Sequence, residues 1–387
     1  MDQMYSNKEL ELIEFVQKAV QIKSYSNEEE TLAQFMKMEM ERLGYDEVLI
    51  DTTGNVIGRI GDGPNKIQFD SHLDTVRVTD EVAWQVPPFS GENREGFIWG
   101  RGSVDMKSAL CASIYAVALA RDRGYIDGKT VYVTGTVCEE FCDGENLKHL
   151  YRELNLMPDY CVICEPSDNR ITLGHKGKAQ IRITTHGVSA HGSAPEKGIN
   201  AVYEMAEIIK GVEHLNESLF HEKGQHGTIV LSDISSEAAS LNAVPSQCSI
   251  YLDRRLSIGE TLEQVKAEMD QLIEGKRASW EVGTLYHTTW KGKQLTYEPM
   301  HDPWKIEEEH PFTKALERAY VGVTKRQVPP FDFWDFGTNA ITPVSMGVPT
   351  IGFGPGDYKL AHMRDERCEV SQIVEAYYVY SELLANL

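Results

Sequence analysis

The chain has 387 residues, of which 41% are hydrophobic and 25% are charged, a composition typical of globular proteins. Its length exceeds one ordinary hydrophobic core, so we expect two domains. The formal net charge of −21 argues against nucleic acids and anionic membranes as partners. The N-terminus does not resemble a signal peptide, and no apolar run approaches membrane-spanning length, which predicts a cytoplasmic protein. The seven cysteines lack disulfide-like spacing, and Cys161 and Cys164 are expected to be buried strand thiols.

The N-terminal part of the chain predicts two helices and three strands before a first polar pair. Apolar residues recur with helical spacing over 6–22, and Ser26–Glu29 matches a capping box that opens a second helix. Strands are predicted over 48–50 and 56–60, and a third, buried strand ends at His72 and Asp74. Alternate residues of a strand share one face. The pair is therefore either a satisfied polar contact or a metal-binding histidine whose second ring nitrogen donates its proton to the carboxylate.

Acidic residues mark the ends of three further predicted elements. Asp105 lies where a glycine-containing loop enters a helix predicted over 106–123, so it is either a helix cap or a metal ligand. The next two buried strands end in Glu139-Glu140 and in Glu165. Strands that alternate with helices predict a largely parallel sheet, and ligands of such sheets gather at the carboxyl ends of the strands. We therefore expect these side chains to lie close together.

The pattern changes from about residue 176, where polar and apolar residues begin to alternate. Strand, helix, strand, strand, helix and strand follow, which is a compact α+β unit. These elements are predicted over 178–185, 199–214, 227–234, 247–255, 260–275 and 279–287. The earlier pattern then returns, with His362 just before a closing helix over 369–386. The sequence thus predicts an α/β catalytic domain formed by residues 1–175 and 296–387, interrupted by an inserted unit at 176–295.

Two histidines and several carboxylates together form a hard ligand set of nitrogen and oxygen atoms. The set consists of His72, Asp105, Glu139, Glu140, Glu165 and His362. Such ligands suit Zn²⁺, Co²⁺ or Mn²⁺. Because Glu139 and Glu140 are neighbours, they can point in different directions, so that one binds a metal and the other handles protons.

The motifs around these residues resemble one known family. They are Ser71-His72-Leu73-Asp74-Thr75, Gly100-Arg101-Gly102-Ser103-Val104-Asp105-Met106-Lys107, Glu139-Glu140, Glu165-Pro166, Ser189-Ala190-His191 and His362. In this order, over nearly the whole chain, the sequence resembles the M20 metallopeptidases and amidohydrolases, such as acetylornithine deacetylase, succinyl-diaminopimelate desuccinylase and glutamate carboxypeptidase. The resemblance implies a mostly parallel central sheet with flanking helices, and a ferredoxin-like lid at 176–295 that also forms a homodimer. It also implies two Zn²⁺ or Co²⁺ ions per subunit.

The resemblance assigns roles to the ligand set. His72 and Glu165 would bind one metal, His362 and Glu140 the other, and Asp105 would bridge both. Asp74 would orient His72. Glu139 would act as general base toward a water between the metals, which attacks an amide carbonyl, and would then return the proton to the leaving nitrogen. The implied reaction is hydrolysis of an amide bond in an N-acyl amino acid or a small peptide.

The resemblance also implies substrate contacts. His191 would stabilise the oxyanion, often from the partner subunit, and Arg255 would hold a substrate carboxylate in a bidentate pair. Its neighbour Arg254 is expected to be a surface charge. Asn242, Gly337 and Thr338 lie in further matching segments and are expected to contact the substrate.

One position departs from the family pattern. Asn339 stands where many members have an acid, so we expect a charged substrate contact to be lost there; the asparagine is similar to a poorly characterised bacterial branch. Deacylase and dipeptidase activities both stay open. Two other classes compete with these: a ligand-binding protein on an inactive scaffold of this family, and a two-metal phosphoesterase.

Overall fold

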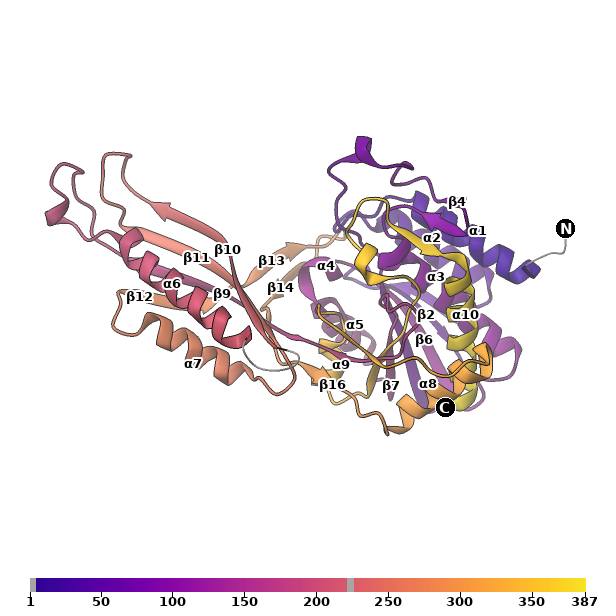
Figure 1. Ribbon diagram of the computed structural model, residues 1–387. Helices are drawn as coiled ribbons and strands as arrows, with labels where there is room; N and C mark the ends of the chain where they lie inside the picture. The colour runs from indigo at the N-terminus through magenta and orange to yellow at the C-terminus, as the bar shows by residue number, and fades with distance from the viewer. Residues whose placement is uncertain (1–4, 221–225) are drawn as a thin grey trace.

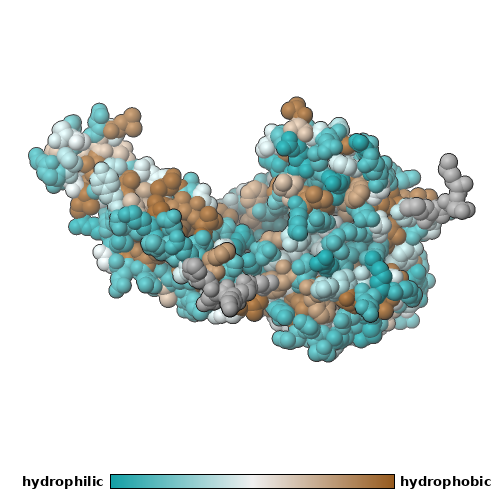
Figure 2. Space-filling view, in the orientation of Figure 1, coloured by the Kyte–Doolittle hydropathy of each residue, from teal (hydrophilic) through white to brown (hydrophobic). Residues whose placement is uncertain are grey.

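The computed structural model describes residues 5–220 and 226–387. Figure 1 shows two lobes: a larger one that contains both chain ends, and an elongated one formed by the inserted unit. Each lobe has its own cluster of buried apolar side chains, as expected for a chain too long for one core. Figure 2 shows a concave surface between the lobes and apolar residues, coloured brown, on the inserted unit. The domain boundaries at 175 and 295 stay a prediction.

The core of the larger lobe is a mixed sheet that has nine strands among the described residues, in the order β1-β2-β6-β3-β7-β18-β8-β16, with β17 beside β8. Strands β6, β3, β7 and β18 run parallel, and the outer pairs β1–β2, β2–β6 and β8–β16 are antiparallel. The strand bounds are β1 Glu47–Ile50, β2 Val56–Ile60, β3 Asn65–His72, β6 Lys129–Thr136, β7 Tyr160–Ile163, β8 Thr172–His175, β16 Trp304–Lys305, β17 Asp332–Trp334 and β18 Thr350–Gly352. The predicted α/β class is confirmed.

Helices flank this sheet, and a small sheet β19-β5-β4 lies beside it (Figure 1). The helices are α1 Asn7–Gln21, α2 Glu30–Arg42, α3 Ser108–Asp122, α4 Glu139–Cys142, α5 Glu145–Leu154, α8 Pro311–Thr324, α9 Ile341–Ser345 and α10 Val370–Asn386. The small sheet has β4 Glu92–Arg94, β5 Phe97–Trp99 and β19 Arg367–Glu369, and the short turns are η1 Glu81–Ala83, η2 Ser103–Lys107 and η4 Tyr358–Leu360.

Helix α3 corrects one expectation about apolar runs. The segment Ser103–Asp122 is long and apolar enough to cross a membrane by length and composition alone, but 89% of its most apolar stretch is buried inside the protein. It is the central helix of the larger core, where α10 packs against it. The long apolar stretch of this segment is therefore explained by its burial in the core of the protein.

The inserted unit has the predicted order of elements. Its sheet runs β10-β11-β9-β12, every neighbouring pair is antiparallel, and α6 and α7 bury their apolar sides against it. This is the ferredoxin-like arrangement. The bounds are β9 Gly177–His186, η3 Pro195–Lys197, α6 Ala201–Phe220, β10 Thr228–Glu237, β11 Gln247–Leu256, α7 Leu262–Ile273 and β12 Ala278–Val282.

The chain enters and leaves the inserted unit through adjacent strands. Strand β15 (Met300–His301) pairs with the start of β9, and β16, which follows it, pairs with β8, which precedes β9. The single strand expected over 279–287 is instead two strands. The second, β13 (Leu285–Thr288), forms a hairpin with β14 (Gln294–Tyr297) that packs against α4 and α5 of the larger lobe.

The predicted capping box at Ser26–Glu29 is wrong. Helix α2 begins at Glu30, and Glu29 makes no side-chain cap. The Ser26 hydroxyl donates to Asp74 at 2.6 Å, and Glu29 accepts from the Cys138 amide at 3.1 Å. Both side chains bond distant parts of the chain because the segment before α2 packs behind the ends of β3 and β6, where buried polar groups need partners.

Candidate active site

The ends of three adjacent parallel strands bring the predicted side chains together. His72 is the last residue of β3, Glu139 and Glu140 open α4 directly after β6, and Glu165 follows β7. Because β6, β3 and β7 are neighbours with the same direction, their carboxyl ends lie at one edge of the sheet. Asp105 reaches this edge from η2, just before α3.

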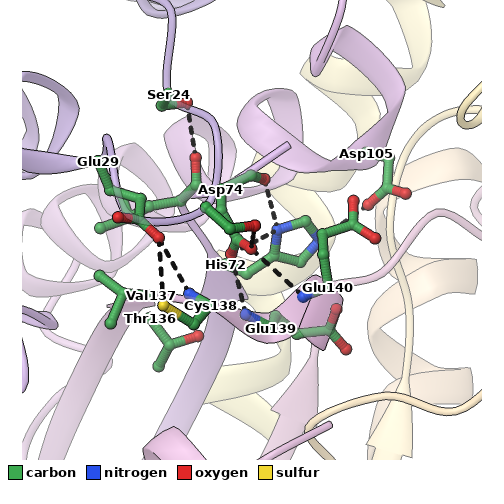
Figure 3. Close-up of polar contacts among 12 residues, drawn as sticks. Ser24, Glu29, His72, Asp74, Asp105, Thr136, Val137, Cys138, Glu139 and Glu140 are labelled. Carbon is green, nitrogen blue, oxygen red and sulfur yellow. Dashed lines mark hydrogen bonds and ion pairs between the residues drawn. The ribbon is translucent and has the colours of Figure 1, made fainter. Parts of the chain in front are cut away.

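The ring of His72 is oriented by the backbone of Asp74. Its Nδ1 lies 2.8 Å from the carbonyl oxygen of Asp74 and 3.6 Å from the carboxylate, so the predicted carboxylate contact is the weaker one. The Asp74 carboxylate instead accepts the backbone amides of Glu139 and Glu140 at 3.0 and 3.3 Å (Figure 3). A proton on Nδ1 donated to the carbonyl leaves the lone pair of Nε2 free to bind a metal. Asp74 thus holds both the histidine and the start of α4.

Asp105 lies between the two histidines. Its Oδ1 is 2.8 Å from Nε2 of His72, and its Oδ2 is 3.1 Å from Nε2 of His362. Glu165 approaches the His72 side, with Oε1 3.7 Å from Nε2, and Glu140 approaches the His362 side, with Oε1 3.1 Å from Nε2. The arrangement has two halves, each with one histidine and one glutamate, that share an aspartate.

This donor set fits two divalent cations. Ligand atoms of His72, Glu139 and Glu165, and of His72, Asp105 and Glu140, lie within 4.8 Å of one another in each group. Burial raises the pKa of Glu139 and Glu165 well above the ordinary value, and neighbouring carboxylates add to the effect. So many carboxylates are costly to bury together unless positive charge offsets them. Two bound cations would supply that charge, and imidazole with carboxylate is a common ligand combination for Zn²⁺ and Co²⁺.

A buried ion pair supports Asp105 and His362 from behind. Glu366 accepts the backbone amides of Val104 and Asp105 at 2.9 and 3.1 Å and pairs with Arg101. Arg101 also donates to the carbonyl oxygen of His362 at 3.1 Å. Arg101 and Glu366 are buried, so this pair fixes the two loops relative to each other. Sequence reasoning missed both residues, although Arg101 lies in the quoted Gly-Arg-Gly motif.

A cavity of about 270 Å³ opens over this cluster, toward the inserted unit. Its lining residues are Asp105, Glu139, Glu140, Asp143, Glu165, Pro166, Lys178, Arg255, Phe336, Gly337, Tyr358, Ala361 and His362. Oε1 of Glu139 is buried and has no hydrogen-bond partner within residues 5–220 and 226–387. Of the predicted substrate contacts, Arg255 and Gly337 line the cavity.

His191 and Asn242 do not line this cavity. Both are exposed, in two loops at the outer end of the sheet of the inserted unit. The loops contact each other there, where the amide of Gly192 donates to the carbonyl of Asn242 at 2.6 Å. Figure 1 shows this end of β9 and β11 pointing away from the larger lobe. Within one chain, the structure therefore does not bring these two residues to the candidate metal ligands.

Two expectations around the cavity need correction. Thr338 is buried, and its hydroxyl accepts the Ala340 amide at 3.1 Å, so it serves the local turn. Asn339 is also buried, and its amide nitrogen donates to Asp70 at 2.8 Å and to Thr136 at 2.9 Å. An acid at 339 would face the carboxylate of Asp70 in a buried site. The asparagine is therefore explained by its hydrogen bond to Asp70 and not by the loss of a substrate contact.

Arg254 is not a surface charge. Its side chain is fully buried beneath α7 and pairs with Glu260 and Glu268. The alternation of β11 does place Arg254 and Arg255 on opposite faces, but the face of Arg254 is the one covered by helices. A buried guanidinium with two carboxylates is a structural feature of the inserted unit.

Comparison with known proteins agrees with this geometry. Residues 69–386 match the peptidase family M20/M25/M40. The chain belongs to this family. The sequence is 35% identical to the uncharacterised protein YgeY of Escherichia coli strain K12 over 378 residues, which is 96% of this chain and 93% of that protein. It is 26% identical to acetylornithine deacetylase of Buchnera aphidicola over 338 residues, 86% of this chain and 83% of the relative.

A solved structure shows the same fold. A protein of Bacillus subtilis described as a dinuclear metal-binding peptidase of the M20 family superposes with a TM-score of 0.70 and 15% identity, over 98% of each chain. The predicted family is confirmed, as is the similarity to a poorly characterised bacterial protein. Membership makes the chain a hydrolytic enzyme that acts on amide bonds with the help of metal ions.

Proposed function

We propose that this enzyme hydrolyses the amide bond of an N-acyl amino acid or small peptide at a site that holds two Zn²⁺ or Co²⁺ ions. The observation that carries the proposal is the Asp105 carboxylate, whose two oxygens face different histidines across the floor of a cavity. His72 and Glu165 would hold one ion, and Glu140 and His362 the other. The lining of the cavity does not support the phosphoesterase alternative. It includes an arginine and a lysine but no glycine-rich phosphate-binding loop among the described lining residues.

Glu139 fits the role of general base. Two bound cations would supply the electrostatic activation of a water and of the substrate carbonyl. Glu139 lines the cavity with a carboxylate oxygen within 4.8 Å of ligand atoms of His72 and Glu165, and its unpaired Oε1 is free to accept a proton from that water. Burial raises the pKa of Glu139, which improves its ability to take the proton and later to donate it to the leaving nitrogen. Its backbone amide is held by Asp74, so the start of α4 is fixed while the carboxylate acts.

The reaction class can be tested with a substrate panel. The protein, loaded with Zn²⁺ or Co²⁺, is assayed against N-acetyl and N-succinyl amino acids and dipeptides. We expect hydrolysis in at least one class, and a fall of ~10³-fold in kcat for Glu139→Gln with unchanged metal content. Glu153→Gln, at a carboxylate on α5 that bonds Thr52, is the matched control. No hydrolysis of any member by the fully loaded wild type would favour an inactive, ligand-binding scaffold.

We also propose that a second copy of the chain completes the site. His191 is exposed at the outer end of the inserted unit. Strand β10 is an edge of its sheet and exposes Val230 and Ile234, an edge suited to pairing with another chain. A homodimer through this unit would let His191 of one chain serve the cavity of the other, where its ring could stabilise the developing oxyanion.

Mixing two inactive variants tests this arrangement. In a mixed dimer of His191→Ala and Glu139→Gln, one cavity combines an intact Glu139 with an intact His191 from the other chain. Activity should therefore reappear after subunit exchange, at a level that reflects this one cavity. Sedimentation of wild type should show a dimer, and Ile234→Glu should shift it toward monomer. Persistent inactivity of an exchanged mixture would place His191 outside the reaction, and a monomeric wild type would exclude the dimer.

A further inference from the structure

Two cations stand side by side where the inserted unit lines the cavity. Lys178 of β9 and Arg255 of β11 are directly paired residues of neighbouring antiparallel strands, and both line the cavity. Like charges in paired positions destabilise a sheet unless something offsets them. Each is offset by one carboxylate: Arg255 by Asp253, with contacts of 2.7 and 3.0 Å, and Lys178 by Asp143.

The position of Lys178 is fixed by contacts across the two lobes. Asp143, directly after α4, accepts hydrogen bonds from the Lys178 ammonium and from the Tyr297 hydroxyl, the latter at 2.6 Å. Its Oδ2 also lies 3.8 Å from Nε2 of His301. The ammonium has three donors, of which Asp143 uses one. Lys178 is therefore a positioned cation with donors left for a ligand, beside an arginine whose guanidinium also has donors beyond those used by Asp253.

The other charges of the cavity favour an anionic ligand beside Lys178 and Arg255. Among the described lining residues, the carboxylates other than Asp143 are those of the candidate metal cluster and Glu139. Asp143 already carries two donors, and the charge of Lys178 lowers its pKa against the effect of burial. Both carboxylates beside these cations, Asp143 and Asp253, are thus already bonded, whereas Lys178 and Arg255 each keep N–H donors that Asp143 and Asp253 do not use, and a substrate carboxylate can accept from them.

We propose that Lys178 is a specificity-determining residue that binds a second anionic group of the substrate beside the carboxylate held by Arg255. This inference rests on the proposed function and names its substrate class: an N-acyl amino acid with two carboxylates. The second carboxylate belongs either to the amino-acid side chain, as in an N-acyl glutamate, or to the acyl group, as in an N-succinyl amino acid. Both present the same chemistry to Lys178.

Matched substrate pairs test the proposal in the wild type. N-acetylglutamate is compared with N-acetylglutamine, and N-succinylalanine with N-butanoylalanine, on the metal-loaded enzyme. We expect kcat/KM to favour the dianion at least tenfold in one pair, and that pair identifies the source of the second carboxylate. Equal rates within both pairs, or faster cleavage of dipeptides with a free amino terminus, would overturn the proposal without any variant.

Variants then assign the preference to Lys178. Lys178→Gln should reduce the preference within the favoured pair to less than threefold while the monoanionic member keeps its rate, and Lys178→Arg should retain the preference. Arg182→Gln, on the same face of β9 but exposed and away from the cavity, should behave as wild type. A Lys178→Gln protein that loses both members of the pair equally would show a structural role instead.

Binding provides a readout that does not need turnover. Calorimetry with metal-loaded Glu139→Gln should show N-acetylglutamate or N-succinylalanine binding at least tenfold more tightly than its monoanionic counterpart, and the double variant with Lys178→Gln should lose this difference. If neither N-acyl amino acids nor dipeptides are hydrolysed, the proposed function fails, yet calorimetry still decides the role of Lys178. Hydrolysis without any charge preference in rate or binding refutes only the inference about Lys178.

Discussion

Oδ1 of Asp105 lies 2.8 Å from Nε2 of His72, while Oδ2 of the same carboxylate lies 3.1 Å from Nε2 of His362. The two histidines come from distant parts of the chain, the end of β3 and the loop before β19. One side chain thus connects two half-sites, and its loss should affect both.

Asp105→Ala should therefore abolish binding of both metals, whereas a variant of an outer ligand should spare one. We expect the ratio of Zn²⁺ to protein to fall from about two toward zero in Asp105→Ala and toward one in Glu140→Ala, since the hydrogen-bond contact of Glu140 is with His362. Elemental analysis after dialysis measures the ratio. Asp122→Asn, exposed at the end of α3, is the control. Full occupancy in Asp105→Ala would contradict the bridging role.

Glu366→Gln should destabilise the fold and weaken metal binding together. Glu366 is buried, pairs with Arg101, and accepts the amide of Asp105. Removing its charge leaves Arg101 buried without a counter-charge, which costs ~3 kcal/mol of unfolding free energy, and misplaces Asp105, which should lower metal affinity about tenfold. Denaturant titration and competition with a chelator measure the two effects. Glu11→Gln, in an exposed pair with Lys8, should change stability by less than ~0.5 kcal/mol.

Arg254→Met should weaken the inserted unit more than the larger lobe. The substitution leaves Glu260 and Glu268 without the buried cation that both contact, at a cost of ~3 kcal/mol. Hydrogen exchange should show lost protection in β11 and α7 and unchanged protection in α3, because the two cores are separate. Arg182→Met, exposed on β9, serves as the comparison. Native protection in β11 and α7 of Arg254→Met would mean that the pair contributes little.

The stability of the fold should depend on the protonation of Glu29. Burial, reinforced by the charge of Asp74, raises the pKa of Glu29 from 4.5 to about 8. The folded state therefore binds a proton that the unfolded state has released across this window. The resulting stabilisation is complete below pH 4.5 and is lost as the pH rises toward 8.

Glu29→Gln should remove this contribution. Each pH unit within the window corresponds to about 1.4 kcal/mol for one proton, so the variant should gain up to about 4 kcal/mol relative to wild type between pH 5 and pH 8. Denaturant titrations at several pH values measure the difference. Glu28→Gln, exposed next to it, should follow the wild-type pH dependence. Parallel curves for Glu29→Gln and wild type would show that Glu29 is ionised in the fold.

The sequence by itself determined the order of the elements, the family, and the identity of the residues at the strand ends. His72, Glu139 and Glu165 directly follow or end buried strands, and a parallel sheet places such ends at one edge. This information is local: the length of an apolar run predicts a strand, and the next polar residue shows what its end carries. Residue 339 shows the limit of such local information: the sequence shows that it is an asparagine but does not show that Asp70 is its hydrogen-bond partner.

Only the tertiary structure decided which partner each polar side chain chose. Asn339 bonds Asp70, Arg254 bonds Glu260 and Glu268, Asp74 caps α4, and Lys178 bonds Asp143. Most of these pairs join segments far apart in the chain, and buried polar groups must be satisfied by whichever donor or acceptor the packed chain brings near them. The position of a residue along a strand indicates which face of the sheet its side chain occupies. Whether that face meets solvent, a helix or a substrate depends on the assembled lobes.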